Sequence, residues 1–193
     1  MIKRSFLFIT LLLWSMSKGF GQQKFEKEYR INSEDVPSAA INFIQKITDK
    51  KRLKWVAEES HDGKTIEAKF YKNRRKYSVE FDKQGQLIDI EILISVSNLP
   101  ASEKVLLEKT LGNEFAKFSI LKIQKQFKNI TFDQIESFFN SKENKDFDTY
   151  DFEVVVKGKS KDRFELYELL LSKSGTLLKK LKFGPQNSLN LQF

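Results

Sequence analysis

The sequence contains no cysteine among its 193 residues and only one histidine, His61. Without cysteine the chain has no disulfide bond, no thiol nucleophile and no zinc site that uses sulfur. His61 precedes Asp62-Gly63, a pair that favours a hairpin turn, and one histidine cannot build a typical zinc site. No glycine-rich phosphate loop is present either. These absences predict a protein that is not an enzyme and has no metal or cofactor.

Long apolar runs are also missing, except near the N-terminus. Lys3 and Arg4 precede an apolar run at residues 6–14, and Gly19-Phe20-Gly21 has the small-x-small pattern of a cleavage site. Nine apolar residues are too few to span a bilayer, which needs about 20. We therefore expect residues 1–21 to be a signal peptide. The mature chain would be exported to the periplasm or secreted, and it would not span a membrane.

The charge balance is basic, with a formal net charge of +8 that falls to +5 when Lys3, Arg4 and Lys18 leave with the signal peptide. A basic surface is compatible with an acidic partner. Nucleic acid is not expected as a partner, because the chain is predicted to be exported. The eighteen phenylalanines predict a core rich in aromatic side chains.

Apolar residues alternate with polar ones along the first half of the chain. In residues 64–72, Ile66, Ala68 and Phe70 alternate with Glu67 and Lys69, which is typical of a strand with one buried face. The same period recurs in residues 53–60, 76–82 and 86–95. A helix is predicted before them, beginning near Asp35 with Pro37 in its first turn.

The second half repeats this order of elements. A helix after Pro100 is followed by predicted strands at residues 119–127, 149–157, 163–172 and 176–183. Tyr77, Lys83, Gly85 and Leu87 recur 90 residues later as Tyr167, Lys173, Gly175 and Leu177. We expect an internal duplication, with modules at residues 22–97 and 98–193 and an insertion near 128–148 that contains a short helix.

The chain resembles the PepSY-like proteins, also called β-lactamase-inhibitor-protein-like or BLIP-like. The residues that carry the resemblance are Val36-Pro37, Trp55, the run from Phe70 to Gly85, Leu99-Pro100 and Tyr167 to Gly175. The resemblance implies an α+β fold: two tandem modules, each a helix plus four antiparallel strands, form one curved sheet with the helices on the convex side. It also implies that the open, concave face grips a protein.

We therefore predict a non-enzymatic binding module that takes a protein or peptide on its open sheet face, with inhibition of a secreted enzyme as one outcome. The partner and the oligomeric state cannot be named from the sequence. The candidate contact residues combine charged side chains with aromatic and apolar ones that fall on the polar face of a strand. They are Lys54, Lys69, Tyr71, Arg74, Arg75, Leu166, Glu168 and Leu170.

Several alternatives stay open. The protein could instead bind a small ligand or an ion in the concavity. Trp55 fits either the core or a binding anchor. Asp89 and Glu91 fit either an acid–base pair or a solvent-facing strand, and Asp146, Asp148 and Asp151 fit either a calcium loop or a solvated loop.

Overall fold

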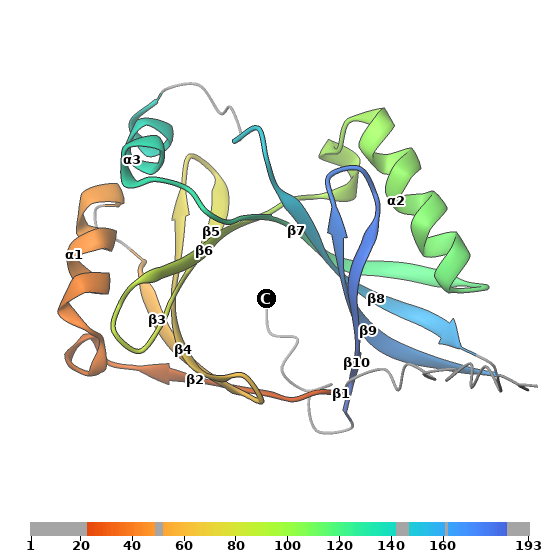
Figure 1. Ribbon diagram of the computed structural model, residues 1–193, viewed down its shortest axis with the longest axis horizontal. Helices are drawn as coiled ribbons and strands as arrows, with labels where there is room; N and C mark the ends of the chain where they lie inside the picture. Colours follow the sequence, from red (N-terminus) through yellow and green to blue (C-terminus); the bar gives the residue numbers. More distant parts are fainter. Residues whose placement is uncertain (1–22, 49–51, 142–146, 161, 185–193) are drawn as a thin grey trace, which may run out of the picture.

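The computed structural model describes residues 23–48, 52–141, 147–160 and 162–184, which form one ten-stranded sheet and three α-helices (Figure 1). The predicted signal peptide and the tail after Gly184 lie outside the described residues. The strands are β1 Gln23–Lys24, β2 Glu26–Ile31, β3 Lys54–Ser60, β4 Gly63–Lys72, β5 Arg75–Phe81, β6 Leu87–Leu93, β7 Phe118–Phe127, β8 Asp151–Ser160, β9 Arg163–Ser172 and β10 Leu177–Phe183. The α-helices are α1 Ser38–Ile47, α2 Ala101–Glu114 and α3 Phe132–Asn140, and 3-10 turns occupy Ser33–Asp35 and Val96–Asn98.

The helices begin at residues that suit helix starts. Pro37 and Pro100 precede α1 and α2, where a missing N–H costs little. Thr131 and Gln134 form a reciprocal capping box at the start of α3. Each helix buries an apolar stripe against the sheet; in α1 the stripe is Ala40, Ile44 and Ile47. The helices all lie outside the curved sheet (Figure 1).

The core lies between these helices and the outer face of the sheet. On β4 the alternating Ile66, Ala68 and Phe70 are all at most 5% exposed, and they pack in one cluster with the helix residues. Trp55 is 6% exposed in the same cluster, so the core alternative for this residue is confirmed. Because outward residues fill the core, the residues between them must face the inside of the curve.

Gly85 makes the tight turn between β5 and β6. Its φ is +80°, a value that favours glycine, and a Cβ there would lie 2.9 Å from the backbone nitrogen of Ala40. Asp82 Oδ1 accepts hydrogen bonds from the backbone N–H groups of Gln84 and Gln86 at 2.9 and 2.8 Å. Gly175, with φ +82°, makes the turn between β9 and β10.

The predicted division into two helix-plus-four-stranded modules is wrong. Strands β6 and β7 pair antiparallel, with Ile90 opposite Phe127, so backbone hydrogen bonds cross the expected boundary. The N-terminal residues add β1 and β2 to the eight strands of the two expected modules. Helix α3 packs beside α1, with the rings of Phe132 and Phe43 5.5 Å apart. Pairing β6 with β7 leaves neither strand as an exposed edge, which explains why one continuous sheet forms.

The N-terminal segment joins the two ends of this sheet. Residues of β2 pair antiparallel with β3, from Glu26 opposite Ser60 to Ile31 opposite Trp55. Only Phe25 separates β2 from β1, and β1 pairs parallel with β10, with Lys24 opposite Phe183. One short stretch of chain therefore contacts both outer strands, and the sheet closes around an interior (Figure 1).

Candidate functional site

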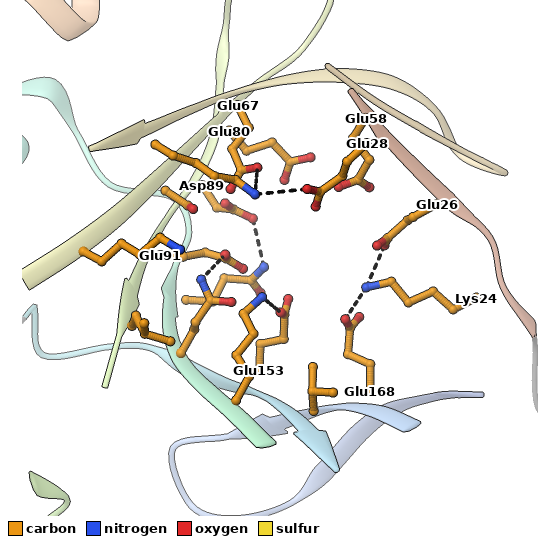
Figure 2. A pocket seen from close by; sticks show the side chains of 18 of the residues that line it. Lys24, Glu26, Glu28, Glu58, Glu67, Glu80, Asp89, Glu91, Glu153 and Glu168 are labelled. Atoms are coloured by element: carbon orange, nitrogen blue, oxygen red, sulfur yellow. Dashed lines mark hydrogen bonds and ion pairs between the residues drawn. The ribbon is translucent and has the colours of Figure 1, made fainter. Parts of the chain in front are cut away.

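The inner face of the closed sheet is charged, whereas its outer face is apolar. The inner face surrounds a cavity of about 170 Å³. Carboxylates from strands on opposite sides of the sheet point into this space (Figure 2). The described lining residues include four lysines, Lys24, Lys69, Lys76 and Lys122, and nine carboxylates, Glu26, Glu28, Glu58, Glu67, Glu80, Asp89, Glu91, Glu153 and Glu168. Small closed sheets usually fill their interior with packed side chains, so a charged interior is unusual.

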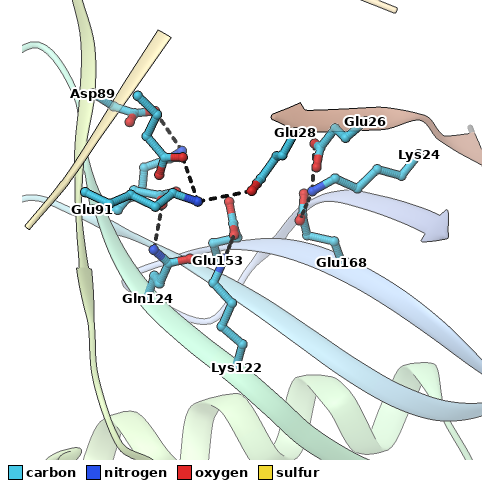
Figure 3. Close-up of polar contacts among 12 residues, drawn as sticks. Lys24, Glu26, Glu28, Asp89, Glu91, Lys122, Gln124, Glu153 and Glu168 are labelled. Atoms are coloured by element: carbon cyan, nitrogen blue, oxygen red, sulfur yellow. Dashed lines mark hydrogen bonds and ion pairs between the residues drawn. The ribbon is translucent and has the colours of Figure 1, made fainter. Parts of the chain in front are cut away.

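Three of the lysines neutralise part of this charge. Lys24, on β1, contacts Glu26 at 2.7 Å and also pairs with Glu168 of β9. The remaining ion pairs are Lys69 with Glu67 and Glu28, at 2.8 and 3.3 Å, and Lys122 with Glu153, at 3.3 Å. The Lys24–Glu168 contact joins the N-terminal segment to β9 inside the closed sheet, whereas the pairs of Lys69 and of Lys122 each lie within one half of the chain (Figure 3).

A second group of inward side chains pairs with amides instead of lysines. Gln124 Nε2 donates to Glu91 Oε2 at 2.6 Å, and Gln126 Nε2 donates to Asp89 Oδ2 at 2.9 Å (Figure 3). The four residues lie on β6 and β7, where the two halves of the sheet meet. Asp89 is only 2% exposed and Gln124 only 4%. We call these four residues the β6–β7 quartet.

Burial controls the protonation of the carboxylates that lack a close lysine. It raises the pKa of Asp89 and of Glu91 well above the ordinary range, and neighbouring carboxylates add to the effect. Burial and repulsion from Glu26 and Glu80 raise the pKa of Glu58 to about 9. The pKa of Glu80 is raised as well, again mainly by burial. These groups therefore retain protons at pH values where exposed carboxylates are ionised.

The lysine-paired carboxylates behave differently from one another. Burial alone would raise the pKa of Glu153, but attraction to Lys122 and Lys24 outweighs burial and lowers it. Burial and repulsion from Glu153 raise the pKa of Glu168 to about 7, although Lys24 acts against them. Charge is thus distributed unevenly within the interior. Attraction to lysine keeps Glu153 ionised, whereas Glu168 retains its proton up to about pH 7.

The predicted contact residues of the first half gather around Tyr71, which is 58% exposed. Lys54, Lys69 and Tyr71 line one surface groove, with Arg30, Arg52 and Lys76 beside them. Tyr71, Arg74 and Arg75 line a second groove, which also includes Lys76 and Leu121. The two grooves share Tyr71 and Lys76, and we call them together the Tyr71 surface.

The predicted contact residues of the second half lie elsewhere. Leu166, Glu168 and Leu170 fall on the inward side of β9, opposite in parity to the buried Tyr167, Leu169 and Leu171. Glu168 lines the cavity, while Leu166 and Leu170 are half-buried beside it and line neither groove. The structure therefore does not bring the two predicted groups into one surface.

The sequence interpretation missed the acidic interior. It considered a solvent-facing position for Asp89, which is wrong because the side chain is buried. The available signal was parity: several lining carboxylates alternate with core residues, as Glu67 does with Ile66 and Ala68. Among the described residues, no group of three or more Asp, Glu or His side chains is arranged to hold a metal ion, and Asp146 lies outside that part of the chain. No helix in the described ranges is both long and apolar enough to cross a membrane.

Comparison with known proteins identifies structures with a similar fold, but it does not assign the chain to a family. No protein-family model and no curated protein matches the chain. A DUF2874 family protein from Bacteroides ovatus ATCC 8483 aligns with a TM-score of 0.51 at 17% identity, covering 76% of this chain and 87% of that one. A protein from Bacteroides eggerthii DSM 20697, called "putative periplasmic", aligns with a TM-score of 0.52 at 13% identity, covering 76% and 88%.

A BLIP-like protein from Bacteroides fragilis NCTC 9343 is 18% identical over 76% of this chain and 86% of its own. Its TM-score of 0.48 is too low to add to the fold assignment. The PepSY-like part of the resemblance and the internal duplication gain no support from these comparisons. The chain therefore shares its fold with a DUF2874 family protein and with a protein called periplasmic, at identities that speak for the fold alone.

Proposed function

We propose that the protein is an exported, non-enzymatic binding module that recognises an acidic protein or peptide through the Tyr71 surface. The observation that carries this proposal is the exposure of Tyr71, 58%, between two grooves with basic linings. Large aromatic residues and arginines contribute most of the energy at protein interfaces. Tyr71 is an exposed aromatic side chain with lysines and arginines around it, so it is suited to such a contact.

The charges of the Tyr71 surface favour an acidic partner. Lys54 in the first groove and Arg74 in the second are exposed, and Arg75 follows Arg74 at the start of β5. The described lining of the second groove includes no Asp or Glu, and that of the first groove includes only Glu28. Because like charges gathered at a concave surface attract the opposite charge over several ångströms, such a surface speeds association with an acidic partner.

Apolar side chains supply the second component of the surface. Leu121 is 43% exposed in the second groove, beside Leu93, Ile94 and Ile120. An acidic segment that also carries apolar side chains would bury these residues while its carboxylates meet the arginines. The signal-peptide pattern of residues 1–21 and the periplasmic name of one fold neighbour support an exported location for this contact.

Capture from the envelope fraction of the source organism, with residues 22–193 immobilised, tests the proposal. We expect one or a few proteins to be retained at low salt and released at high salt, because screening weakens charge attraction. The same proteins should be lost with the Tyr71→Ala/Arg74→Ala variant. The matched control is Lys104→Ala/Val105→Ala, which removes an exposed cation and a 62%-exposed apolar side chain from α2. Equal capture by both variants would refute the assignment of the surface.

A further inference from the structure

The interior cavity is lined by more carboxyl groups than basic side chains. Its described lining contains nine carboxylates and four lysines, an excess of five carboxylates. Three of the lysines make ion pairs with Glu26, Glu28, Glu67, Glu153 and Glu168. Glu58, Glu80, Asp89 and Glu91 take no part in these ion pairs, and all four point into the same space (Figure 2). Buried carboxylates in proteins are normally paired, so these four groups offer a site to a cation.

A second observation points to the same deficit. The side-chain oxygens of Gln124 and Gln126 are buried and have no hydrogen-bond partner, although both residues are at least nine-tenths buried. Each amide nitrogen faces the carboxyl oxygen to which it donates, so the amide oxygen of each residue points away from that contact. Buried polar atoms are nearly always satisfied, so these two acceptors indicate a missing donor.

The chemistry of the missing group follows from its surroundings. The β6–β7 quartet with Glu58 and Glu80 offers acceptors, so the ligand must supply positive charge and several N–H donors. A bare metal ion fits poorly, since no group of three carboxylates among the described residues is arranged to hold one. The cavity of about 170 Å³ holds roughly five or six waters at about 30 Å³ each, which is the space of a short linear molecule.

We propose that the cavity binds a small organic dication with two alkylammonium groups, one of them held by Asp89, Glu91 and the side-chain oxygens of Gln124 and Gln126. The second ammonium reaches Glu80, which lies opposite Asp89 in the β5–β6 pair, and Glu58. Glu28, Lys69 and Lys76 line both the cavity and the groove beside Tyr71, so the cavity adjoins the surface there. The residues that hold the dication are not those of the Tyr71 surface, so either site can exist without the other.

Titration calorimetry of residues 22–193 with 1,4-diaminobutane tests the proposal at about pH 7. We expect saturable binding of the diamine and none of 1,4-butanediol, which has the same carbon chain without charge. Because burial raises the pKa of the four lysine-free carboxylates, the dication should displace protons from them. Proton release would appear as a heat that depends on the ionisation enthalpy of the buffer.

The Asp89→Asn/Glu91→Gln variant should weaken diamine binding about tenfold or more, since two charge-assisted contacts are lost. Both substitutions keep the side-chain shape and relieve buried charge, so the variant should fold, which thermal unfolding would verify. The matched control is Glu108→Gln/Glu136→Gln, which removes two exposed carboxylates from α2 and α3 and should bind as the parent does. Absence of diamine binding, equal binding of butanediol, equal affinity of the cavity variant, or tighter binding of calcium chloride than of the diamine would each overturn the proposal.

Discussion

At the scale of single residues, the pair formed by Lys122 and Glu153 is the interaction on which the interior depends most. Their charged atoms are 3.3 Å apart, and the side chains are 27% and 16% exposed. Lys122 is the largest single cause that keeps the pKa of Glu153 low against burial. Without this lysine the carboxylate would stand among other carboxylates, where its charge is unfavourable.

Replacing Lys122 with methionine should therefore destabilise the protein. Breaking a buried pair from one side costs about 3–5 kcal/mol; partial exposure of this pair reduces the expected loss to about 2 kcal/mol. Urea unfolding at neutral pH measures it. Lys109→Met, on the exposed side of α2, is the control and should change little.

The double variant Lys122→Met/Glu153→Gln separates lost packing from unpaired charge. Removing the orphaned carboxylate should restore most of the stability, because a neutral amide is less costly to bury than a charge. If Lys122→Met alone has the stability of the parent protein, Lys122 does not neutralise the interior.

At the scale of elements, the segment of β1 and β2 decides whether the sheet is open or closed. It pairs with β10 through β1 and with β3 through β2. Lys24 in this segment also reaches Glu168 and Glu26 inside the cavity. Backbone pairing and internal charge thus act together to close the sheet.

Deleting β1 and β2, to give residues 32–193, should expose β3 and β10 as free edges. Unpaired edge strands promote association with other chains. We expect dimers or larger species in light scattering where residues 22–193 give one smaller species, together with a lower midpoint of urea unfolding. A deletion variant with unchanged mass distribution and unchanged stability would show that the N-terminal segment does not close the sheet.

At the scale of the whole molecule, the closed sheet separates an apolar outer layer from a charged interior. The core lies under α1, α2 and α3, and the carboxylates lie on the opposite face of the same strands. The folded state therefore binds protons that the unfolded chain has already released. This difference in proton binding sets how stability depends on pH.

Stability should decrease between about pH 5 and pH 9. The unfolded carboxyls titrate near 4.5, whereas Glu168 titrates at about 7 and Glu58 at about 9 in the folded state. Between these values the folded state holds more protons, so the free energy of unfolding falls as pH rises, by on the order of a few kcal/mol. Glu153 acts oppositely, but only in acid, because its pKa is lowered.

Urea unfolding at pH 5, 7 and 9 measures this trend. The Asp89→Asn/Glu91→Gln variant serves as the internal comparison, since it removes two of the raised carboxyls and should flatten the profile. Stability that rises from pH 5 to pH 9 in the parent protein would contradict the assignment of protonated carboxyls to the interior.

Local patterns in the sequence determined most of the elements. Period-two alternation predicted residues 53–60, 64–72 and 76–82 as strands, and the structure has β3, β4 and β5 there. The short helix predicted within the insertion near residues 128–148 corresponds to α3, which begins with the Thr131–Gln134 capping box. Alternation and capping depend on neighbouring residues, so the sequence alone contains them.

The path of the sheet depended on contacts between distant parts of the chain. Strand β6 pairs with β7, and Gln23–Lys24 pairs with Lys182–Phe183. These pairings use backbone N–H and C=O groups, which are the same in nearly every residue, so the side-chain pattern does not reveal them. The expectation of two four-stranded modules with an open face was wrong, because the N-terminal segment adds two strands that close the sheet.

The candidate site shows the same division. Parity along each strand determined that Glu67, Asp89 and Glu91 lie on the face opposite the core. Whether that face meets water or other carboxylates was decided only when the N-terminal segment closed the sheet. The side of a strand on which a residue lies follows from the local sequence. A closed interior forms only when strands that are distant in the sequence pair with each other.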